Sequence, residues 1–396
     1  MWLTDLLALI ILVYWIKVLW EFRRYRHAIK PLPNVSGPAA TIPGSEPTPL
    51  VSVILAAKEE EASIVETVKH LLSQSYPRLE IIAVNDRSSD RTGAKLDELK
   101  RWAERGKDFP VPLTVVHVTS LPSGWLGKNH ALYQGFREAR GQLILFTDAD
   151  IRFHRDAISS AVRYMLREQA DHVTATPAMT ANGFWLRAFV HYFLFSLSLF
   201  IKPWRANDDR RRKHGMGVGA FNLLTRKAYD AIGTHRAIAM RPDDDLQLGS
   251  RIKRAGFRQR LVIAKEQLEV EWYPNLKSAM QGLEKNFFSG FRYRLGLAAA
   301  ALFGQLLLFF YPFVGIWFSG GWSSAALGAS IAVLAGQYVA TVRSLTRDDG
   351  REVFVLPLSV LLLAYVLVRS VVLTLKRGGV YWRGTFYPLR DLKKMN

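Results

Sequence analysis

Short apolar runs alternate with amphipathic segments through the middle of the chain. The runs are brief and rich in β-branched residues, as buried strands are. They occupy residues 51–57, 80–85, 113–118, 143–147 and 172–176. The segments between them have helical periodicity and occupy residues 63–73, 91–105, 129–140 and 156–168. This alternation predicts an α/β domain with a doubly wound, mostly parallel sheet covered on both faces.

The first of these helices carries a start signal. Ser63 is followed three residues later by Glu66, which is the spacing of a capping box. We therefore expect the Ser63 hydroxyl to cap the helix that follows.

Four longer apolar stretches lie outside the alternation, at residues 2–20, 295–318, 325–342 and 353–375. Each is about long enough to cross a bilayer, which takes roughly 20 residues. The first has no basic segment before it and no small-residue cleavage site after it, so it does not have the form of a signal peptide. We predict an N-terminal transmembrane anchor at residues 1–22 and C-terminal transmembrane segments within residues 295–375.

A stretch dominated by aromatic side chains, residues 184–204, interrupts the strand–helix pattern. Aromatic residues are enriched where a helix meets the membrane–water interface. We expect an interfacial helix near residues 184–204 that forms a floor through which a lipid reaches the site. A helix buried in the domain core is the simpler alternative.

The formal net charge of +19 is concentrated beside the apolar stretches. Residues 23–49 form a basic and Pro-rich linker, and residues 376–396 form a basic tail. Such flanks follow the positive-inside rule and attract an anionic membrane surface. They predict a cytoplasmic domain at residues 50–294, in an integral protein of a bacterial inner membrane. Three full crossings after residue 294 would put the tail on the opposite side, so we expect one segment to be re-entrant or interfacial.

Two classes of site are disfavoured by composition. The chain has no cysteine, which excludes disulfides and thiolate metal sites. Nucleic acid is not an expected partner, because a groove that binds phosphates is not lined with aspartates.

Acidic residues collect where predicted strands end. Asn85-Asp86-Arg87-Ser88-Ser89-Asp90 follows one strand, Thr147-Asp148-Ala149-Asp150 follows another, and Asp243-Asp244-Asp245 opens a later helix. Ligands of open parallel sheets bind at the carboxyl ends of the strands. Because like charges repel, this arrangement predicts a bound cation or a bound substrate, and a metal-bound nucleotide diphosphate is the simplest candidate.

Asp148 and Asp150 are the candidate metal ligands. Residues i and i+2 of an extended segment point the same way, so both carboxylates can address one Mg²⁺ or Mn²⁺, or one cation and one sugar hydroxyl. A surface turn with two solvated acids is the alternative.

Four other residues are candidates for binding the nucleotide. Asp86 can accept hydrogen bonds from a base or ribose, although an Asx turn also explains it. Ala57 and Glu59 end the first strand at the same sheet edge, where Glu59 is otherwise a solvated charge. Lys128 follows Gly124-Trp125-Leu126-Gly127 at a helix start, where it can meet a phosphate or simply be solvated.

Asp244 and Asp245 are the candidate catalytic residues. Acids are favoured in the first turn of a helix by its dipole, which is the simpler explanation. The functional hypothesis is a general base that removes the proton of an acceptor hydroxyl.

Taken together, these motifs resemble family 2 glycosyltransferases, whose nucleotide-sugar domain is of the GT-A type. Ala57-Lys58-Glu59, Asn85-Asp86-Arg87-Ser88, Thr147-Asp148-Ala149-Asp150 and Asp244-Asp245-Leu246-Gln247-Leu248 fall in the family's order, over roughly residues 49–294. The resemblance implies a Rossmann-like GT-A fold and an inverting transfer. It implies that Glu59 and Asp86 hold the nucleoside, that Asp148 contacts ribose or sugar, that Asp150 binds the metal and that Asp245 is the base. Asp244 replaces the glutamate of the family's usual Glu-Asp pair.

Within that family the chain is similar to members that act on hydrophobic acceptors. The similarity lies in Gly124-Trp125-Leu126-Gly127-Lys128 and in the tail at residues 381–387. It implies transfer of a single sugar, from a UDP-sugar or related donor, to a lipid such as ceramide, a hopanoid, a carotenoid or diacylglycerol.

A polyprenyl-phosphate glycosyltransferase is the first alternative, and a processive polysaccharide synthase is the next. Synthases carry Gln-x-x-Arg-Trp, whereas Gln281-Gly282-Leu283-Glu284-Lys285 lacks both Arg and Trp. Lys285, Arg292 and Arg294 are candidates to replace the missing arginine. A non-catalytic membrane protein that binds a nucleotide-sugar is the alternative outside enzymes.

Overall fold

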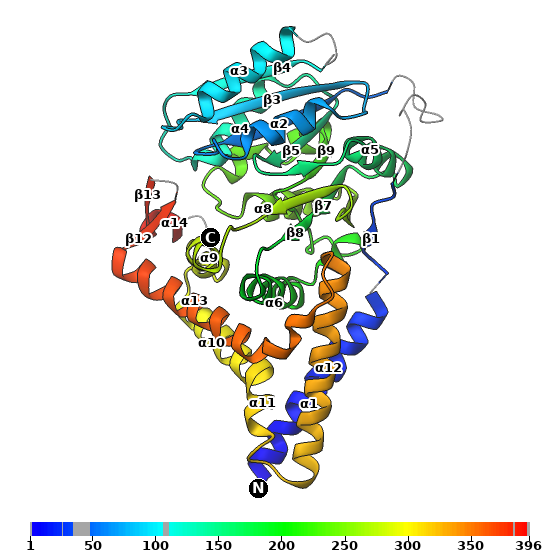
Figure 1. Ribbon diagram of the computed structural model, residues 1–396, viewed down its shortest axis with the longest axis vertical. Helices are drawn as coiled ribbons and strands as arrows, with labels where there is room; N and C mark the ends of the chain where they lie inside the picture. Colours follow the sequence, from blue (N-terminus) through cyan, green and yellow to red (C-terminus); the bar gives the residue numbers. More distant parts are fainter. Residues whose placement is uncertain (1, 26, 35–47, 106–110, 383–384, 394–396) are drawn as a thin grey trace. The chain divides into compact units, whose positions relative to one another are not determined.

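The computed structural model describes residues 2–25, 27–34, 48–105, 111–382 and 385–393. These residues form two compact units (Figure 1). The sheet unit contains Ala28–Met179 and Pro203–Val270, and the helical unit contains Met1–His27, Thr180–Lys202 and Glu271–Asn396. Most of the predicted Pro-rich linker lies outside the described residues.

A central sheet of eight strands runs through the sheet unit in the order β1-β10-β7-β9-β5-β2-β3-β4 (Figure 1). Its strands are β1 Lys30–Pro31, β2 Val51–Ala57, β3 Leu79–Asp86, β4 Leu113–Val118, β5 Leu143–Asp148, β7 His172–Thr176, β9 Asn222–Thr225 and β10 Gln259–Ile263. Neighbouring strands are parallel, except that β9 is antiparallel to both β5 and β7. The prediction of a mostly parallel sheet is confirmed. A smaller sheet has the order β6-β11-β8, with β6 Arg152–Phe153, β11 Leu268–Glu271 and β8 Ala178–Thr180.

Helices cover both faces of the central sheet because its strands are apolar on both sides. In β2, Val53 and Leu55 belong to one buried core and Ile54 belongs to the other. The first core includes α2 Ile64–Leu72, α3 Thr92–Arg105 and α5 Ala157–Arg167. The second includes α4 Gly127–Glu138, α7 Arg226–Ala231 and α8 Asp244–Arg254. Burial of each such side chain stabilises the fold by about 1.5–3 kcal/mol.

The predicted capping box at the start of α2 is wrong. The Ser63 backbone is already in a helical conformation, and its hydroxyl makes no capping hydrogen bond. Ser63 Oγ instead donates to the Glu60 carboxylate at 3.1 Å. Glu66 pairs with Arg152, 3.0 Å away, so both members of the expected box have other partners.

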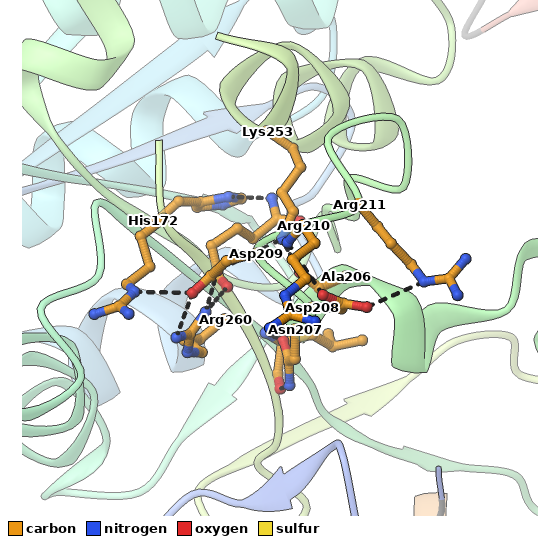
Figure 2. A network of polar contacts seen from close by, with 12 residues as sticks. His172, Ala206, Asn207, Asp208, Asp209, Arg210, Arg211, Lys253 and Arg260 are labelled. Atoms are coloured by element: carbon orange, nitrogen blue, oxygen red, sulfur yellow. Dashed lines mark hydrogen bonds and ion pairs between the residues drawn. The ribbon is translucent and has the colours of Figure 1, made fainter. Parts of the chain in front are cut away.

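A polar network holds α8 to the segment that precedes β9, and Figure 2 shows its members. Lys253 of α8 is 2% exposed, and its ammonium donates to the Ala206 carbonyl of the 3₁₀ helix η1 Pro203–Asn207 at 2.5 Å. Asp209 accepts from Arg258 at 3.0 Å and from Arg260 at 2.8 Å. Hydrogen bonding to Arg260 is the main cause that lowers the pKa of Asp209 to about 2. The network fixes the helix whose first turn carries Asp244.

The helical unit contains the predicted apolar segments. Its elements are α1 Trp2–Tyr25, α6 Phe184–Ile201, α9 Leu276–Gly290, α10 Leu295–Gln305, the π-helix η3 Leu306–Phe310, α11 Tyr311–Gly315, α12 Gly321–Leu345, the 3₁₀ helix η4 Arg351–Val355, α13 Leu356–Arg377, β12 Gly379–Trp382, β13 Thr385–Pro388 and α14 Leu389–Lys393. In the part of the chain that is described, four helices are long and apolar enough to cross a membrane: Phe184–Ile201, Leu295–Gly315, Gly321–Leu345 and Arg351–Arg377.

Helix α1 runs beside α12 (Figure 1). The single acid near its start, Asp5, accepts a hydrogen bond from the Ser323 hydroxyl of α12. Further along, the Trp15 indole donates to the Leu308 carbonyl at 3.1 Å. These two polar side chains of an otherwise apolar helix thus have partners on the helices beside it.

The aromatic helix α6 groups with the helical unit rather than with the sheet. His191 at its centre is fully buried, with its two ring nitrogens 3.2 Å from Glu352 and 3.1 Å from Asp348. Arg187, one turn earlier, donates to Glu352 at 2.8 Å. These contacts tie α6 to the segment between α12 and α13. A position in the membrane interface stays a prediction.

Candidate active site

The strands that end in acidic motifs are neighbours in the sheet. Strand β2 lies between β5 and β3, with Ala56 opposite Asp148 and Ala57 opposite Asn85. Parallel strands end at the same edge, so Ala57, Asp86 and Asp148 reach one side of the sheet. The sequence prediction that these motifs share an edge is confirmed by this register.

Lys128 links two of the acidic motifs. Its ammonium lies 2.8 Å from Asp148 Oδ1 and 3.4 Å from Asp244 Oδ2. Lys128 stands in the first turn of α4, Asp148 ends β5, and Asp244 begins α8. Asp244 is only 6% exposed, so its carboxylate depends on such partners for stabilisation. The fold thus builds one charged cluster from three segments that are far apart in sequence.

Asp245 joins this cluster through a glycine loop that sequence reasoning did not single out. The backbone N–H of Gly219 donates to Asp245 Oδ2 at 2.8 Å, and the Leu246 N–H donates to Oδ1 at 2.7 Å. A Cβ on Gly219 would lie 2.7 Å from Asp148 Oδ2, and one on Gly217 would lie 1.9 Å from the Asp245 carbonyl. The glycines at every second position, 215, 217 and 219, are the feature of the sequence that could have indicated this loop.

The charges of the cluster shift the pKa values of its members. Burial, reinforced by the charge of Asp244, raises the pKa of Asp245 to about 7. Burial also raises the pKa of Asp244, against the opposing effect of Lys128. For Lys128, burial favours the neutral amine, but the Asp148 and Asp244 carboxylates outweigh it and raise the pKa above its usual range. Asp245 therefore has the proton affinity of a general base that operates near neutral pH.

Asp86 lies next to the cluster but already has a partner. It is 3% exposed, and Arg87 donates to both of its oxygens, at 2.8 and 3.1 Å. Arg87 adopts a left-handed backbone, with φ of 54°, to fold back in this way. A Cβ on Gly127 would lie 2.5 Å from Asp86 Oδ2, so the glycine before Lys128 is needed for close contact.

Glu59 has a structural contact that sequence reasoning did not predict. Its carboxylate accepts from the Ser89 N–H at 2.8 Å and from the Ser89 hydroxyl at 3.0 Å. The Glu59 N–H in turn donates to the Ser88 hydroxyl at 3.2 Å. These bonds join the loop after β2 to the loop after β3. Glu59 thereby shapes the edge at which Asp86 lies.

Asp150 does not lie in an extended segment. Strand β5 ends at Asp148, and Ala149 and Asp150 form a turn. The alternation argument for two carboxylates on one side therefore fails, although both acids stay at the same strand end. The Thr147 hydroxyl, which donates to the Ala220 carbonyl at 2.7 Å, holds this strand end to the glycine loop.

The described residues contain no group of three or more His, Cys, Asp or Glu side chains arranged to hold a metal ion. Mg²⁺ needs fewer protein ligands than that, because it binds through one or two carboxylates and completes its shell with substrate phosphates and water. The hard oxygen donors of Asp148 and Asp150 fit such an ion. The Lys128 ammonium beside Asp148 shows that this position already stabilises a cation.

A second residue that the sequence analysis did not identify holds the cluster in place. Asn129 is fully buried, and its amide donates to the carbonyls of Ile238, Ala239 and Arg241 at 2.9, 3.1 and 2.9 Å. These carbonyls lie in the segment that leads into Asp243 and α8. Asn129 follows Lys128 directly, so it couples the start of α4 to the start of α8.

Three residues were candidates to replace the arginine of the synthase motif Gln-x-x-Arg-Trp, and the structure describes the side chains of two of them. The Lys285 side chain lies outside the described residues, and Arg292 and Arg294 are exposed in the turn after α9. Glu284, at the arginine position, instead accepts from Arg369 at 2.9 Å and from Arg377 at 3.1 Å. Both arginines belong to α13.

Comparison with known proteins finds a family model that matches most of the sheet unit. Residues 52–233 match the family model described as Glycosyl transferase family 2. A beta-monoglucosyldiacylglycerol synthase of Synechocystis sp. is 35% identical over 222 residues, which are 54% of this chain and 42% of that protein. A 4,4'-diaponeurosporenoate glycosyltransferase of Staphylococcus aureus is 28% identical over 204 residues, half of each chain.

A probable glycosyltransferase of Bacillus subtilis, YdaM, is 43% identical over 104 residues, which cover 26% of this chain and 23% of that protein. The chain thus spans half or less of the length of these relatives. The resemblance to family 2 glycosyltransferases given by the motifs is confirmed for the region that these matches cover.

Among solved structures, a mannosyltransferase of Pyrobaculum calidifontis in complex with GDP-Man and Mn²⁺ is similar in fold. The TM-score is 0.52 at 19% identity, over 94% of this chain and 99% of that one. At this identity the likeness concerns the fold alone. Together with the observed sheet, it confirms the prediction of a GT-A fold.

Proposed function

We propose, on the premise that residues 52–233 form a glycosyl transferase family 2 domain, that this chain moves one sugar from a nucleotide-diphosphate sugar to a membrane lipid. The observation that carries the proposal is the contact of Lys128 with both Asp148 and Asp244. This contact brings the end of β5 and the start of α8 into one charged site, and Asp245 directly follows Asp244 in the chain.

Asp245 is the proposed base. Its carboxylate would take the proton of an acceptor hydroxyl as that oxygen attacks the anomeric carbon, and the bond from this carbon to the diphosphate oxygen would break. Such a displacement inverts the configuration of the sugar. The hydrogen bonds from Gly219 and Leu246 hold the carboxylate in one orientation while it receives the proton.

The donor would lie along the strand ends. Asp86 and Glu59 would contact the nucleoside, with Ala57 at the same edge, and Asp148 would contact ribose or sugar. Asp148 and Asp150 are the proposed holders of a divalent cation, Mg²⁺ or Mn²⁺, which when bound stabilises negative charge on the departing diphosphate. Lys128 would contribute a second positive charge beside the phosphates.

The lipid acceptor is inferred from the helical unit and from the relatives. Four of its described helices are long and apolar enough to cross a membrane. The names of two relatives concern diacylglycerol and diaponeurosporenoate, both hydrophobic. We propose an integral protein of the bacterial inner membrane whose catalytic unit faces the cytoplasm, with its basic flanks against anionic lipid. The donor is proposed to be a UDP-sugar.

The test uses the full chain reconstituted in nanodiscs that contain anionic lipid. UDP- and GDP-sugars are supplied with diacylglycerol, ceramide or hydroxylated isoprenoid acceptors, and glycolipid is measured by mass spectrometry. We expect one sugar per lipid, loss of product with EDTA, and loss of product in Asp150→Ala and Asp245→Asn. Full turnover by both variants would refute the assigned roles.

The same experiment separates the alternatives. A polyprenyl-phosphate acceptor is already anionic, so Asp245→Asn would keep its activity while Asp150→Ala loses it. Products with many sugars would indicate a polysaccharide synthase. Tight nucleotide binding without turnover on any acceptor would indicate a non-catalytic binding protein.

A further inference from the structure

We propose that Lys128 acts as an internal cation that occupies the carboxylate cluster until a divalent ion and a nucleotide diphosphate arrive together. The inference rests on the proposed function, because it concerns how the same site takes up its metal. It assigns to Lys128 a role in the order of binding, beyond contact with a phosphate.

The geometry supports this role. The ammonium is 2.8 Å from one acid and 3.4 Å from another, which are distances of direct ion pairs. Asp148 is one of the two acids proposed to hold the metal. A divalent ion at Asp148 and the ammonium therefore compete for the same carboxylate.

Electrostatics indicates why the cluster needs a resident cation. Lys128 brings Asp148 and Asp244 together, and Asp245 follows Asp244 and bonds to Gly219, which lies against Asp148. Asp244 is buried and the other two acids are partly buried, so their like charges repel. A single ammonium reduces this repulsion and holds the acids in place. It also reduces the attraction for a free divalent ion, which must displace the ammonium before it can bind.

A nucleotide diphosphate removes this obstacle. Lys128 is the second residue of α4, and the N-terminus of a helix favours anions. A diphosphate placed there offers the ammonium a new partner, so Lys128 can leave Asp148 as the metal enters. Metal and nucleotide then bind cooperatively, and binding of metal alone is weak.

The test measures Mn²⁺ binding without turnover. The full chain in nanodiscs is titrated with MnCl₂, and free Mn²⁺ is followed by electron paramagnetic resonance, first alone and then with saturating UDP or GDP. For Lys128→Met we expect Mn²⁺ alone to bind at least about tenfold more tightly than in the wild type, since a nearby positive charge has been removed. The gain in Mn²⁺ affinity on adding nucleotide should shrink correspondingly.

Three further variants make the result specific. Lys128→Gln also removes the charge but keeps a hydrogen-bond donor, and it serves if Lys128→Met fails to fold. Lys128→Arg keeps the charge and should bind Mn²⁺ alone as weakly as the wild type. Lys95→Met removes a lysine whose ammonium donates to the Glu61 carbonyl at 2.7 Å, outside the cluster, and should change nothing.

Unchanged or weaker Mn²⁺ binding in the neutral Lys128 variants would overturn the proposal, even if the wild type transfers sugar. Tighter Mn²⁺ binding in Lys95→Met as well would overturn it too, because the effect would then come from net charge. Tighter binding confined to the neutral Lys128 variants would support it. If that pattern appeared but no sugar were transferred to any acceptor, the proposed function would fail and the role of Lys128 would stand.

Discussion

The backbone N–H of Gly219 donates to the Asp245 carboxylate at 2.8 Å, while the same residue lies against the carboxylate of Asp148. One glycine thus separates the proposed base from the proposed donor-binding acid. A side chain at this position would enter the space between them, because its Cβ would come within 2.7 Å of Asp148 Oδ2.

Gly219→Ala should lower the rate of transfer with little effect on expression. The added methyl group displaces the Asp148 carboxylate, and misplacement of a reacting group by about 1 Å costs about 10²-fold. The measurement is kcat/KM with the donor varied. Gly296→Ala is the matched control, because a Cβ at that position would meet no neighbouring atom within 4 Å, and its activity should not change. An equal loss in both variants would contradict the argument.

The dependence of kcat/KM on pH should reveal the raised pKa of Asp245, at the start of α8. Because the pKa of Asp245 is about 7, kcat/KM should rise with pH and level off above neutrality, whereas an ordinary aspartate titrates near pH 4. Asp245→Asn should reduce kcat/KM by about 10²–10⁴-fold. A pH profile that is flat from pH 5 to pH 8 would rule out Asp245 as the titrating base.

The same raised pKa predicts a pH-dependent stability. The folded protein binds the Asp245 proton more tightly than the unfolded chain, so ionisation costs stability as pH rises from about 4 towards 7. Asp245→Asn removes this cost. The asparagine amide can accept only one of the two backbone hydrogen bonds from Gly219 and Leu246, a loss that is the same at every pH. We therefore expect the unfolding temperature of the variant, relative to that of the wild type, to be higher at pH 8 than at pH 4. Thermal unfolding of the full chain in nanodiscs checks this, and an equal difference at both pH values would contradict it.

Asn129 should matter for both folding and activity. Asn129→Ala removes one donor from each of the carbonyls of Ile238, Ala239 and Arg241. The Ile238 and Ala239 carbonyls keep the backbone N–H groups of Arg241 and Leu126 as donors, so the loss falls mainly on the Arg241 carbonyl, at a cost of about 1–3 kcal/mol for an unsatisfied buried group. Asn129→Asp has nearly the same shape but sets oxygen against these carbonyls, so it should lower the unfolding temperature further than the alanine variant does. If the isosteric variant were the milder of the two, packing and not hydrogen bonding would explain the role of Asn129.

A buried ion pair should stabilise the helical unit. Glu352 is 2% exposed and bonds to Arg187 and His191 of α6. Glu352→Ala should destabilise this unit by about 1–3 kcal/mol, because the buried His191 and the half-buried Arg187 lose a carboxylate hydrogen-bond partner. Asp349→Asn is the control, because Asp349 lies in the same segment but forms an exposed ion pair with Arg351. This substitution should leave the unfolding temperature unchanged. Similar losses from both substitutions would show that burial does not decide the effect.

The prediction from sequence succeeded where local pattern and burial agree. Strands such as Val51–Ala57 are apolar on both faces, so only a sheet covered on both sides buries them, and their order along the chain implies parallel pairing. The capping box failed because Ser63 and Glu66 each found a partner outside the motif. A short motif is weaker than the tertiary contacts that compete with it.

The order of residues along the chain was enough to establish which acids follow which strands, and therefore that Asp86 and Asp148 share a sheet edge. The three-dimensional fold was needed to show that Lys128 stands between Asp148 and Asp244, that Gly219 donates to Asp245, and that Arg87 folds back onto Asp86. The difference has a physical reason. Strand periodicity is encoded by neighbours in the chain, whereas the balance of buried charge depends on side chains brought together from segments that lie far apart in sequence.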